Sequence, residues 1–426
     1  MAKLKVLMLG TYDSKAAGHI QSNYLRMPDC VDAQMVTLYG LYGDVPYCFY
    51  STHKTFWQKI KLFRYTGLFF KWWRTLYCMI RFGVRPIIDK NHLEYCFNDS
   101  EFVPYSAKEI LKKCPEGFIP DLITIHLHHG FISSNIVKEL HKLTGAQIAY
   151  MFVDEAPMTG GCHYPVDCKN YMDGCHSCPA LSRGKKLAAI QMKCKEENLK
   201  GIPMYICGSP YDLRVAKKTK LFKEAKAIPS IHNPQVTITE KEEARKELGL
   251  KDDSFIVMIG AAHVGDVRKG IIYSIEAINL AAQHIPTLVV LVVGTKNSLL
   301  TENIVNAEVI ELGFVDLDRL FLSFSAADCF LSTTIADSGP MMVNYSIAIG
   351  TPVISFPIGI AEDLVIHKKT GYLAEYRNTN DLKEGLLFVS KLNSESQKQM
   401  SDDCKKLIKE KNTSWVEGLI EALGKA

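Results

Sequence analysis

The chain has 426 residues, of which 47% are hydrophobic and 23% are charged, and its formal net charge is +4. A chain of this length exceeds what one hydrophobic core usually supports, so two domains are expected. The composition is typical of a soluble globular protein, and so small a net charge does not by itself indicate nucleic-acid binding.

The cysteines and the first residues bear on the compartment. Thirteen Cys are scattered along the chain, which favours a reducing environment. The first apolar run, LKVLMLG, has no cleavage pattern and predicts a buried strand rather than a targeting segment. No stretch approaches the roughly 18 uninterrupted apolar residues of a membrane span. We therefore expect a cytoplasmic protein.

Predicted strands and helices alternate through the first half of the chain. Strands are expected at residues 4–9, 36–41, 121–128, 147–153 and 204–207, and helices at residues 19–26, 132–143, 184–198 and 209–219. The loop GTYDSKAAG, which ends at Gly18, joins the first strand to the first helix. Such a loop can hold an anion or a sugar at the helix start, and it is equally compatible with an ordinary turn.

The segment 45–88 combines basic and aromatic residues. Between Asp44 and Asp89 the chain has no acidic residue, and the same interval holds three of its four Trp. Its basic residues between 54 and 85 are Lys54, Lys59, Lys61, Arg64, Lys71, Arg74, Arg81 and Arg85. This pattern favours a helix pair that contacts an anionic membrane surface through residues 54–85. The alternative is an internal hairpin that buries its rings in the first domain, and no motif supports nucleic-acid binding.

Polar residues follow two predicted strands of the first half. The strand at 121–128 ends in His126 and His128, with His129 next, and Asp154 comes directly after the strand at 147–153. Ligands of open α/β sheets bind outside the carboxyl ends of the strands. Asp154 and His128 are therefore candidate catalytic residues, although each histidine taken alone suits a structural role equally well.

A cysteine-rich loop spans residues 159–180. It contains four cysteines and ends in a C-x-x-C pattern; they are Cys162, Cys168, Cys175 and Cys178. Four cysteines this close together in a reducing compartment predict a structural zinc ion, because a loop rich in Gly and polar residues has little core of its own. His163 or His176 could replace one ligand. The alternatives are two disulfides or four free thiols.

The second half repeats the alternation of strands and helices. Strands are expected at residues 255–261, 287–294, 307–313, 328–332 and 353–356, and helices at residues 271–285, 316–327 and 337–350. The predicted fold is therefore α/β, with two doubly wound Rossmann-like domains. We expect an N-terminal domain at 1–228, a hinge near 229–253, a C-terminal domain at 254–393 and helices at 394–426 that pack back across the hinge.

The stretch 335–372 predicts an anion site. Asp337 and Ser338 are typical helix-start residues, Pro340 suits a first turn, and Gly350 ends the helix. A helix start beside the carboxyl end of a strand offers free N–H groups to phosphate. Arg268 follows another strand with Lys269 and suits a diphosphate. The candidate binding residues are Arg268, Lys269, Gly270, Ser338, Gly339, Met341, Met342, Val343 and Tyr345.

These motifs resemble those of GT-B-fold glycosyltransferases of the family 4 type, such as bacterial sugar transferases of capsule, O-antigen and exopolysaccharide synthesis. The resemblance rests on DLITIHLHHGF at 121–131, on TGGCHYPVDCKNYMDGCHSCP at 159–179, on RKG at 268–270, on 337–353 and on HKKTGYL at 367–373. It covers nearly the whole chain. It departs from the family pattern at Val153, where a His is usual, and at Asp337 and Tyr345, where the family has two Glu.

The resemblance implies retaining transfer of a sugar from a nucleotide-diphosphate sugar to a glycan, with a lipid-linked acceptor matching the 54–85 patch. Asp337 would meet the donor sugar and Lys269 the leaving phosphate, with neither a divalent metal nor another catalytic cofactor. The N-terminal domain, with Gly18, His128 and Asp154, would bind the acceptor, although Gly18 is equally a candidate for the donor. The protein would then lie on the cytoplasmic face of the inner membrane.

Two other functions stay open. One is a non-catalytic partner subunit that binds a sugar nucleotide, which Val153 and Tyr345 favour. The other is a different GT-B-fold enzyme, such as an epimerase or a phosphorylase.

Overall fold

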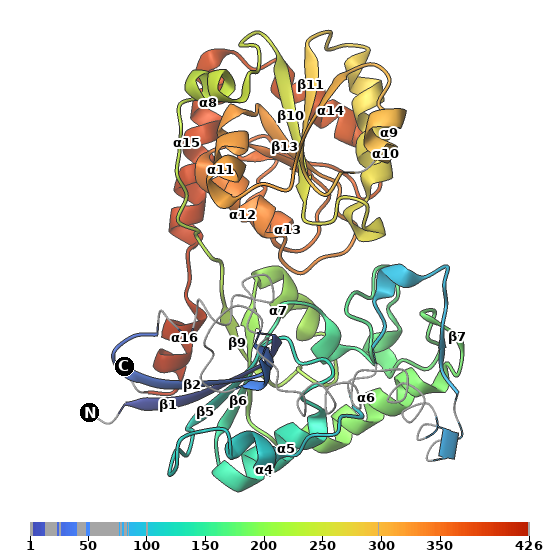
Figure 1. Cartoon of the computed structure of the whole chain (residues 1–426), viewed down its shortest axis with the longest axis vertical. Coiled ribbons are helices and arrows are strands. Elements are labelled where there is room, and N and C mark those ends of the chain that lie inside the picture. The colour runs from blue at the N-terminus through green and yellow to red at the C-terminus, as the bar shows by residue number, and fades with distance from the viewer. Residues whose placement is uncertain are drawn as a thin grey trace. The chain divides into compact units, whose positions relative to one another are not determined.

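The computed structural model describes residues 3–12, 24, 27–40, 48–51, 76, 79–80, 83, 85–98, 101–296 and 298–424. Gly18 and nearly all of the segment 54–85 lie outside these residues, so the structure does not bear on their predicted roles. The chain divides into two compact units (Figure 1). Unit 1 comprises Met1–Gly208, Asp212–Pro229 and Trp415–Ala426, and unit 2 comprises Ser209–Tyr211 and Ser230–Ser414.

Unit 1 is built on a sheet whose order is β3-β2-β1-β5-β6-β8-β9. Its strands are β1 (Leu4–Tyr12), β2 (Val31–Gly40), β3 (Cys48–Ser51), β5 (Leu122–Ile125), β6 (Gln147–Met151), β8 (Met204–Gly208) and β9 (Lys226–Pro229). All neighbouring strands run parallel. The strand order reverses direction between β1 and β5, which makes this pair the topological switch point of the unit.

Helices cover both faces of this sheet. The elements around it are β4 (Ile87–Ile88), η1 (Leu93–Tyr95), α4 (Ala107–Leu111), α5 (Ser134–Thr144), η2 (Ala156–Met158), η3 (Asn170–Asp173), β7 (Leu181–Arg183), α6 (Lys186–Leu199), α7 (Pro210–Ala216) and α16 (Trp415–Ala422). Strand β4 pairs with β7 as a small antiparallel ladder outside the main sheet.

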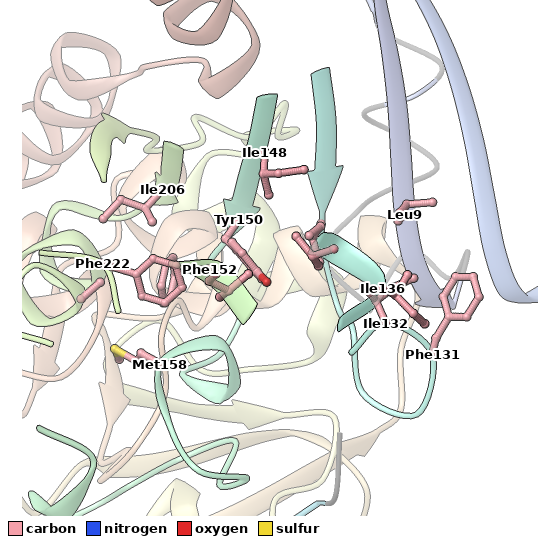
Figure 2. Close-up of a cluster of buried hydrophobic side chains, with 14 of the residues drawn as sticks. Leu9, Phe131, Ile132, Ile136, Ile148, Tyr150, Phe152, Met158, Ile206 and Phe222 are labelled. Atoms are coloured by element: carbon pink, nitrogen blue, oxygen red, sulfur yellow. The ribbon is translucent and has the colours of Figure 1, made fainter. Parts of the chain in front are cut away.

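Strand β1 shows how the sheet is buried on both faces. Successive side chains of a strand point to opposite faces. Leu7 and Leu9 therefore belong to the core layer of α5 and α6, whereas Val6 and Met8 belong to the layer of α16. Figure 2 shows part of the first layer, in which Leu9 lies near side chains of the segment that leads into α5. A strand covered on both faces needs a continuous apolar sequence, and VLML supplies it.

Unit 2 contains a second parallel sheet, of order β12-β11-β10-β13-β14-β15. Its strands are β10 (Phe255–Ala261), β11 (Leu288–Gly294), β12 (Glu308–Gly313), β13 (Cys329–Ser332), β14 (Val353–Ser355) and β15 (Gly371–Leu373). The strand order reverses between β10 and β13, so the switch point lies at the carboxyl ends of these two strands.

The helices of unit 2 lie on both sides of its strands. They are α8 (Lys241–Leu248), η4 (Val267–Lys269), α9 (Ile271–Ala282), α10 (Ser298–Asn303), α11 (Leu317–Ala326), α12 (Met341–Ile349), α13 (Ile360–Leu364), α14 (Thr379–Ser390) and α15 (Ser394–Lys411). Figure 1 shows α9, α10 and α14 on one side and α8, α11, α12 and α15 on the other. The predicted fold class, two doubly wound α/β domains, is confirmed.

One boundary differs from the sequence-based expectation. The polar stretch expected to form the hinge contains α8, which packs against α11 in unit 2. The helices expected at 394–426 are α15, which belongs to unit 2, and α16, which belongs to unit 1. No helix among the described residues is both long and apolar enough to cross a membrane.

A buried ion pair fixes α8 to the sheet. Arg245 is 6% exposed, and its Nη2 donates to Asp328 Oδ2 at 2.8 Å while its Nε donates to the carbonyl of Ala326 at 3.1 Å. The same Asp328 carboxylate accepts from Lys241 Nζ at 2.7 Å and from the Ile256 amide at 2.7 Å. Asp328 thereby joins the start of β13 to β10 and to α8.

The two cations on Asp328 should differ in their effect on stability. Replacing Arg245 by Met leaves a buried carboxylate with one half-exposed partner, so we expect the free energy of unfolding to fall by about 3 kcal/mol. Lys241 is 35% exposed, so Lys241→Met should lower the free energy of unfolding by less than about 1 kcal/mol. Chemical denaturation measures both, and equal effects would contradict the assigned role of Arg245.

Candidate functional site

The loops that follow β10 and β13 meet at the switch point of unit 2. The first loop contains Arg268 and Lys269, and the second leads to Asp337. The Ile335 amide donates to the carbonyl of Arg268 at 2.8 Å, and Thr333 Oγ1 donates to the carbonyl of Lys269 at 3.0 Å. Two segments that are far apart in the sequence are thus held together by their main chains.

An ion pair lies at the centre of this contact. Lys269 Nζ donates to Asp337 Oδ2 at 2.6 Å, and the two side chains are 24% and 14% exposed. Asp337 Oδ1 accepts from the Gly339 amide at 3.2 Å. A partly exposed ammonium can exchange its carboxylate partner for a phosphate oxygen, because both offer charge-assisted hydrogen bonds.

Gly270 allows the two loops to approach each other. Its φ is +63°, and a Cβ atom added there would lie 2.1 Å from the carbonyl oxygen of Thr333. Any other residue would therefore be strained and would push the second loop away. Beside it, Arg268 Nη2 donates to Asp266 Oδ2 at 2.5 Å, which holds the guanidinium at the same loop.

The start of α12 differs from the expectation. Asp337 and Ser338 were expected to begin the helix, with Pro340 in its first turn. The helix begins instead at Met341 with Pro340 as its N-cap and without a side-chain cap, because Asp337 turns to the Gly339 amide and to Lys269. The Val343 amide donates to the carbonyl of Pro340 at 2.9 Å.

The other residues predicted around α12 have distinct surroundings. Ser338 is 1% exposed, and its hydroxyl has no hydrogen-bond partner among the described residues. The Met342 methyl lies against Gly260 at the end of β10, and Gly339 has open space where a side chain would be. The Met341 and Met342 amides have no acceptor four residues earlier in the helix, as at any helix start.

Tyr345 lies one turn into α12 and packs into the core on one side. Its ring centroid is 5.3 Å from that of Phe321, and burial raises the pKa of its hydroxyl. The neighbouring Asn344 donates to the carbonyl of His232 at 2.8 Å. Tyr345 is therefore an aromatic packing residue at the position where the resembled family has a carboxylate.

In unit 1 the predicted Asp154 forms a pair that was not predicted. Asp154 is 3% exposed, and its Oδ2 lies 2.6 Å from His163 Nδ1 while its Oδ1 accepts from the Ala156 amide at 2.9 Å. Burial by itself would raise the pKa of Asp154, but the charge and hydrogen bond of His163, together with His128 and the Ala156 amide, outweigh it and lower the pKa. The side chain is therefore a carboxylate at neutral pH.

Polar side chains of α6 hold the loop that carries this pair. Lys195 is 3% exposed, and its Nζ donates to the carbonyls of Ala156 at 2.7 Å and Thr159 at 2.8 Å. Gln191, one turn earlier, donates to the carbonyl of Gly160 at 3.1 Å. A Cβ atom on Gly160 would lie 2.3 Å from the α6 backbone. The loop is therefore fixed to the helix by buried hydrogen bonds and close packing.

The histidines after β5 are buried and neutral. Burial lowers the pKa of His126 and of His128 to about 3, and that of His129 to about 4. His126 Nε2 lies 3.2 Å from Thr124 Oγ1. His128, the predicted catalytic histidine, packs edge-on against Tyr150. At neutral pH none of these three histidines is an imidazolium that could donate its extra proton.

The four cysteines of the 159–180 loop do not form a metal site as placed. Cys162 and Cys178 hydrogen-bond to each other, and Cys175 Sγ accepts from the Gly160 amide at 3.3 Å. In the part of the chain that is described, no group of three or more His, Cys, Asp or Glu side chains could hold a metal ion. The arrangement of the described residues therefore does not show a zinc site, and zinc stays a prediction from the sequence.

Sequence reasoning missed His163 and Lys195. His163 was considered only as a substitute zinc ligand, since its pairing with Asp154 depends on how the loop folds. The sequence pattern could have indicated that Lys195 and Gln191 are buried. They lie one turn apart on the face of α6 that also buries Leu187 and Met192. A buried polar residue on an apolar face usually has a specific partner.

The C-terminal part matches a known family. Residues 240–407 match the family described as glycosyl transferases group 1. This range includes both loops of the unit 2 site. A comparison with curated proteins gives no match.

Solved structures resemble the whole chain. The complex of HepE from Anabaena with UDP-glucose has a TM-score of 0.63 at 12% identity and covers 99% of this chain and 100% of its own. Sucrose-phosphate synthase from Thermosynechococcus elongatus has a TM-score of 0.60 at 13% identity, covering 99% and 98%. A glycosyltransferase from Rickettsia africae has a TM-score of 0.56 at 12% identity, covering 100% and 98%. At these identities the likeness shows the fold.

The buried histidines predict a loss of stability in mild acid. The unfolded state binds protons below the ordinary histidine pKa of about 6.5, whereas folded His126 and His128 stay neutral until about pH 3. Their contribution to stability is complete above pH 6.5 and is lost as the pH falls. Below pH 6.5, each of these two histidines should lower the free energy of unfolding by about 1.4 kcal/mol for every unit by which the pH falls.

Denaturation at pH 7.5, 6.0 and 5.0 measures this slope. His126→Gln, which cannot titrate, should reduce it, whereas His92→Gln should not, because Glu94 raises the pKa of that exposed histidine. A slope unchanged by His126→Gln would rule out the assigned burial effect.

Proposed function

We propose that this protein is a glycosyltransferase that moves a sugar from a nucleotide-diphosphate sugar to a glycan acceptor. The proposal is supported by the match of residues 240–407 to the glycosyl transferases group 1 family and by the GT-B fold of the chain. The observation that carries the proposal is the Lys269–Asp337 pair at the switch point of unit 2. Ligands of doubly wound sheets bind at this place. The Anabaena structure that resembles the chain contains UDP-glucose, so UDP is the first nucleotide to test.

The diphosphate would bind between the two loops of unit 2. Lys269 would leave Asp337 for a phosphate oxygen, and Arg268 would add a second positive charge. The amides of Met341 and Met342, at the start of α12, would donate to the other oxygens. Ser338 supports this placement, because its buried hydroxyl has no partner among the residues described and could donate to the ligand.

Asp337 would then have a second task. When Lys269 moves to the phosphate, the carboxylate becomes free to accept hydrogen bonds from the donor sugar. The developing negative charge on the leaving diphosphate would be stabilised by Lys269, Arg268 and the α12 amides. Tyr345 can offer only its hydroxyl to the ribose, so ribose recognition would be weaker than with a carboxylate.

The finer features of the reaction are also proposals. Retention of anomeric configuration, a family 4 type mechanism without a catalytic cofactor and a role in surface polysaccharide synthesis rest on the sequence resemblance. A lipid-linked acceptor and contact with an anionic membrane surface rest on the basic and aromatic residues of 54–85. The alternative of a non-catalytic binding subunit is motivated by Val153 and by the packing of Tyr345 on Phe321.

Replacing Lys269 should separate donor binding from folding. We expect Lys269→Met to raise the dissociation constant of UDP at least about tenfold, because a charge-assisted hydrogen bond to phosphate is lost. Lys241→Met is the matched control: it also removes a lysine paired with an aspartate at 2.7 Å, but at the start of β13 rather than beyond its end. Calorimetric titration with UDP measures both. An unchanged dissociation constant in Lys269→Met would refute the donor site.

Product analysis tests the chemistry. Incubation with UDP-glucose, UDP-N-acetylglucosamine and lipid-linked acceptors should yield a glycoside whose anomeric configuration, read by NMR, equals that of the donor. Asp337→Asn should bind UDP with similar affinity and lose about 100-fold in turnover, since it keeps the shape and removes the charge. An inverted product would exclude the retaining mechanism, and UDP binding without any turnover would favour the partner-subunit alternative.

A further inference from the structure

The loop that leads from β13 to α12 is anchored at Ile335 through both polar groups of its main chain. The Ile335 amide donates to the carbonyl of Arg268 at 2.8 Å, and the Ile335 carbonyl accepts from the hydroxyl of Tyr376 at 3.1 Å. Tyr376 follows β15, which lies two strands away from β13 in the sheet. Because Ile335 is only two residues before Asp337, a side chain from a third loop takes part in placing that carboxylate.

The ring of Tyr376 belongs to a row of aromatic rings at the same edge of the sheet. Its centroid lies 5.8 Å from that of Phe356, which directly follows β14, and Phe356 lies 5.6 Å from Tyr273 in the first turn of α9. A Cβ atom on Gly270 would lie 3.2 Å from the Tyr273 ring. The row therefore extends from the loop that carries Lys269 to the side chain that holds the loop of Asp337.

Arg377 contacts the Tyr376 ring from the neighbouring position. Its guanidinium carbon lies 4.9 Å from the ring centroid, a distance typical of a cation–π contact. The φ of Arg377 is +60°, a conformation that is uncommon for residues other than glycine and persists where the surrounding structure holds it. The direction of the Tyr376 hydroxyl is therefore fixed by contacts of the ring as well as by the hydrogen bond to Ile335.

Another segment packs against the main chain of Asp337 itself. Gly359, in the loop after β14, has a φ of +57°, and a Cβ atom there would lie 2.5 Å from the carbonyl oxygen of Asp337. The side chain of Asp337 is held differently, by Lys269 at 2.6 Å and by the Gly339 amide at 3.2 Å. The main-chain contacts do not involve the ammonium of Lys269.

These main-chain contacts gain importance when Lys269 leaves Asp337. In the proposed donor complex Lys269 binds the diphosphate, so the carboxylate loses its charged partner. Its position then depends on the Gly339 amide and on the main-chain anchors, one of which is the Tyr376 hydroxyl. A displaced carboxylate would form weaker hydrogen bonds to the donor sugar, because a hydrogen bond weakens steeply when its distance and angle depart from the optimum.

We propose that Tyr376 is a positioning residue whose hydroxyl holds Asp337 where its carboxylate accepts hydrogen bonds from the donor sugar, and that Phe356 and Arg377 hold the ring that carries this hydroxyl. The inference rests on the proposed donor site of unit 2 and deepens it. Recognition of the sugar, as distinct from recognition of UDP, then depends on a residue outside the two loops that contact the diphosphate.

Calorimetric titration of the full-length protein separates these two kinds of recognition. The ligands are UDP and whichever of UDP-glucose and UDP-N-acetylglucosamine the wild type binds more tightly. Tyr376→Phe keeps the ring and removes the hydroxyl. We expect the dissociation constant of UDP to change by less than about twofold and that of the UDP-sugar to rise about fivefold, because a hydrogen bond that places Asp337 is lost. An unchanged dissociation constant for the UDP-sugar, or an equal rise for both ligands, would overturn the proposal.

Tyr372→Phe is the matched control. Tyr372 lies in β15, and its hydroxyl donates to Asp381 Oδ1 in α14 at 2.7 Å. The substitution therefore removes another tyrosine hydroxyl bond of unit 2, but not one to the loop of Asp337, and both dissociation constants should stay as in the wild type. Thermal unfolding verifies that both variants are folded. UDP-sugar binding that is weakened equally in Tyr372→Phe and Tyr376→Phe would contradict a specific role of Tyr376.

A double-mutant cycle tests whether Tyr376 acts through the carboxylate. In an Asp337→Ala protein no carboxylate remains to be positioned. Adding Tyr376→Phe to it should therefore change the dissociation constant of the UDP-sugar by less than about twofold. A further fivefold rise, of about the size expected in the wild-type background, would mean that Tyr376 acts independently of Asp337 and would refute the positioning role.

The outcomes distinguish this inference from the proposed function. A wild-type protein that binds neither UDP nor a UDP-sugar would contradict the proposed donor site, and with it the inference. A wild-type protein that binds both ligands, together with a Tyr376→Phe variant of equal affinity for the UDP-sugar, would contradict the inference alone and leave the donor site standing.

Discussion

The parallel arrangement of all strands in each sheet is the constraint on which both sites depend. Because the strands of a sheet run in one direction, the loops that follow them gather at one edge. Because the strand order reverses once, two of these loops diverge at the switch point and leave room for a ligand. In unit 2 these loops bring Lys269 and Asp337 to 2.6 Å from each other. In unit 1 they bring Tyr12 next to His129.

The two sites use polar groups in opposite ways. Unit 2 presents a partly exposed ion pair that can open, and the helix start beside it has no side-chain cap. This arrangement suits an anionic ligand. Unit 1 buries its charges: Asp154 is bound by His163, and Lys195 is bound by main-chain carbonyls. Buried charges with all their partners in place hold a rigid loop.

Several parts of the fold could be predicted because they depend on local sequence. Strand β10 was expected at residues 255–261 and lies there, since a run of apolar residues bounded by polar ones leaves few alternatives. The start of α12 was placed too early, because Asp337 suits a helix cap and is used instead by Lys269. The sequence predicts a hinge where α8 lies, because most residues of this helix are polar and only Ala244 and Arg245 are buried.

The sequence alone determined the class of fold, the two parallel sheets and the loops that carry polar residues, because hydrophobic periodicity and turn chemistry act between near neighbours. Only the tertiary structure decided which polar groups pair. Lys269 and Asp337 are 68 positions apart, and His163 meets Asp154 because the 159–180 loop is packed against α6. Such pairings depend on the order of strands in the sheet, and no local pattern encodes that order.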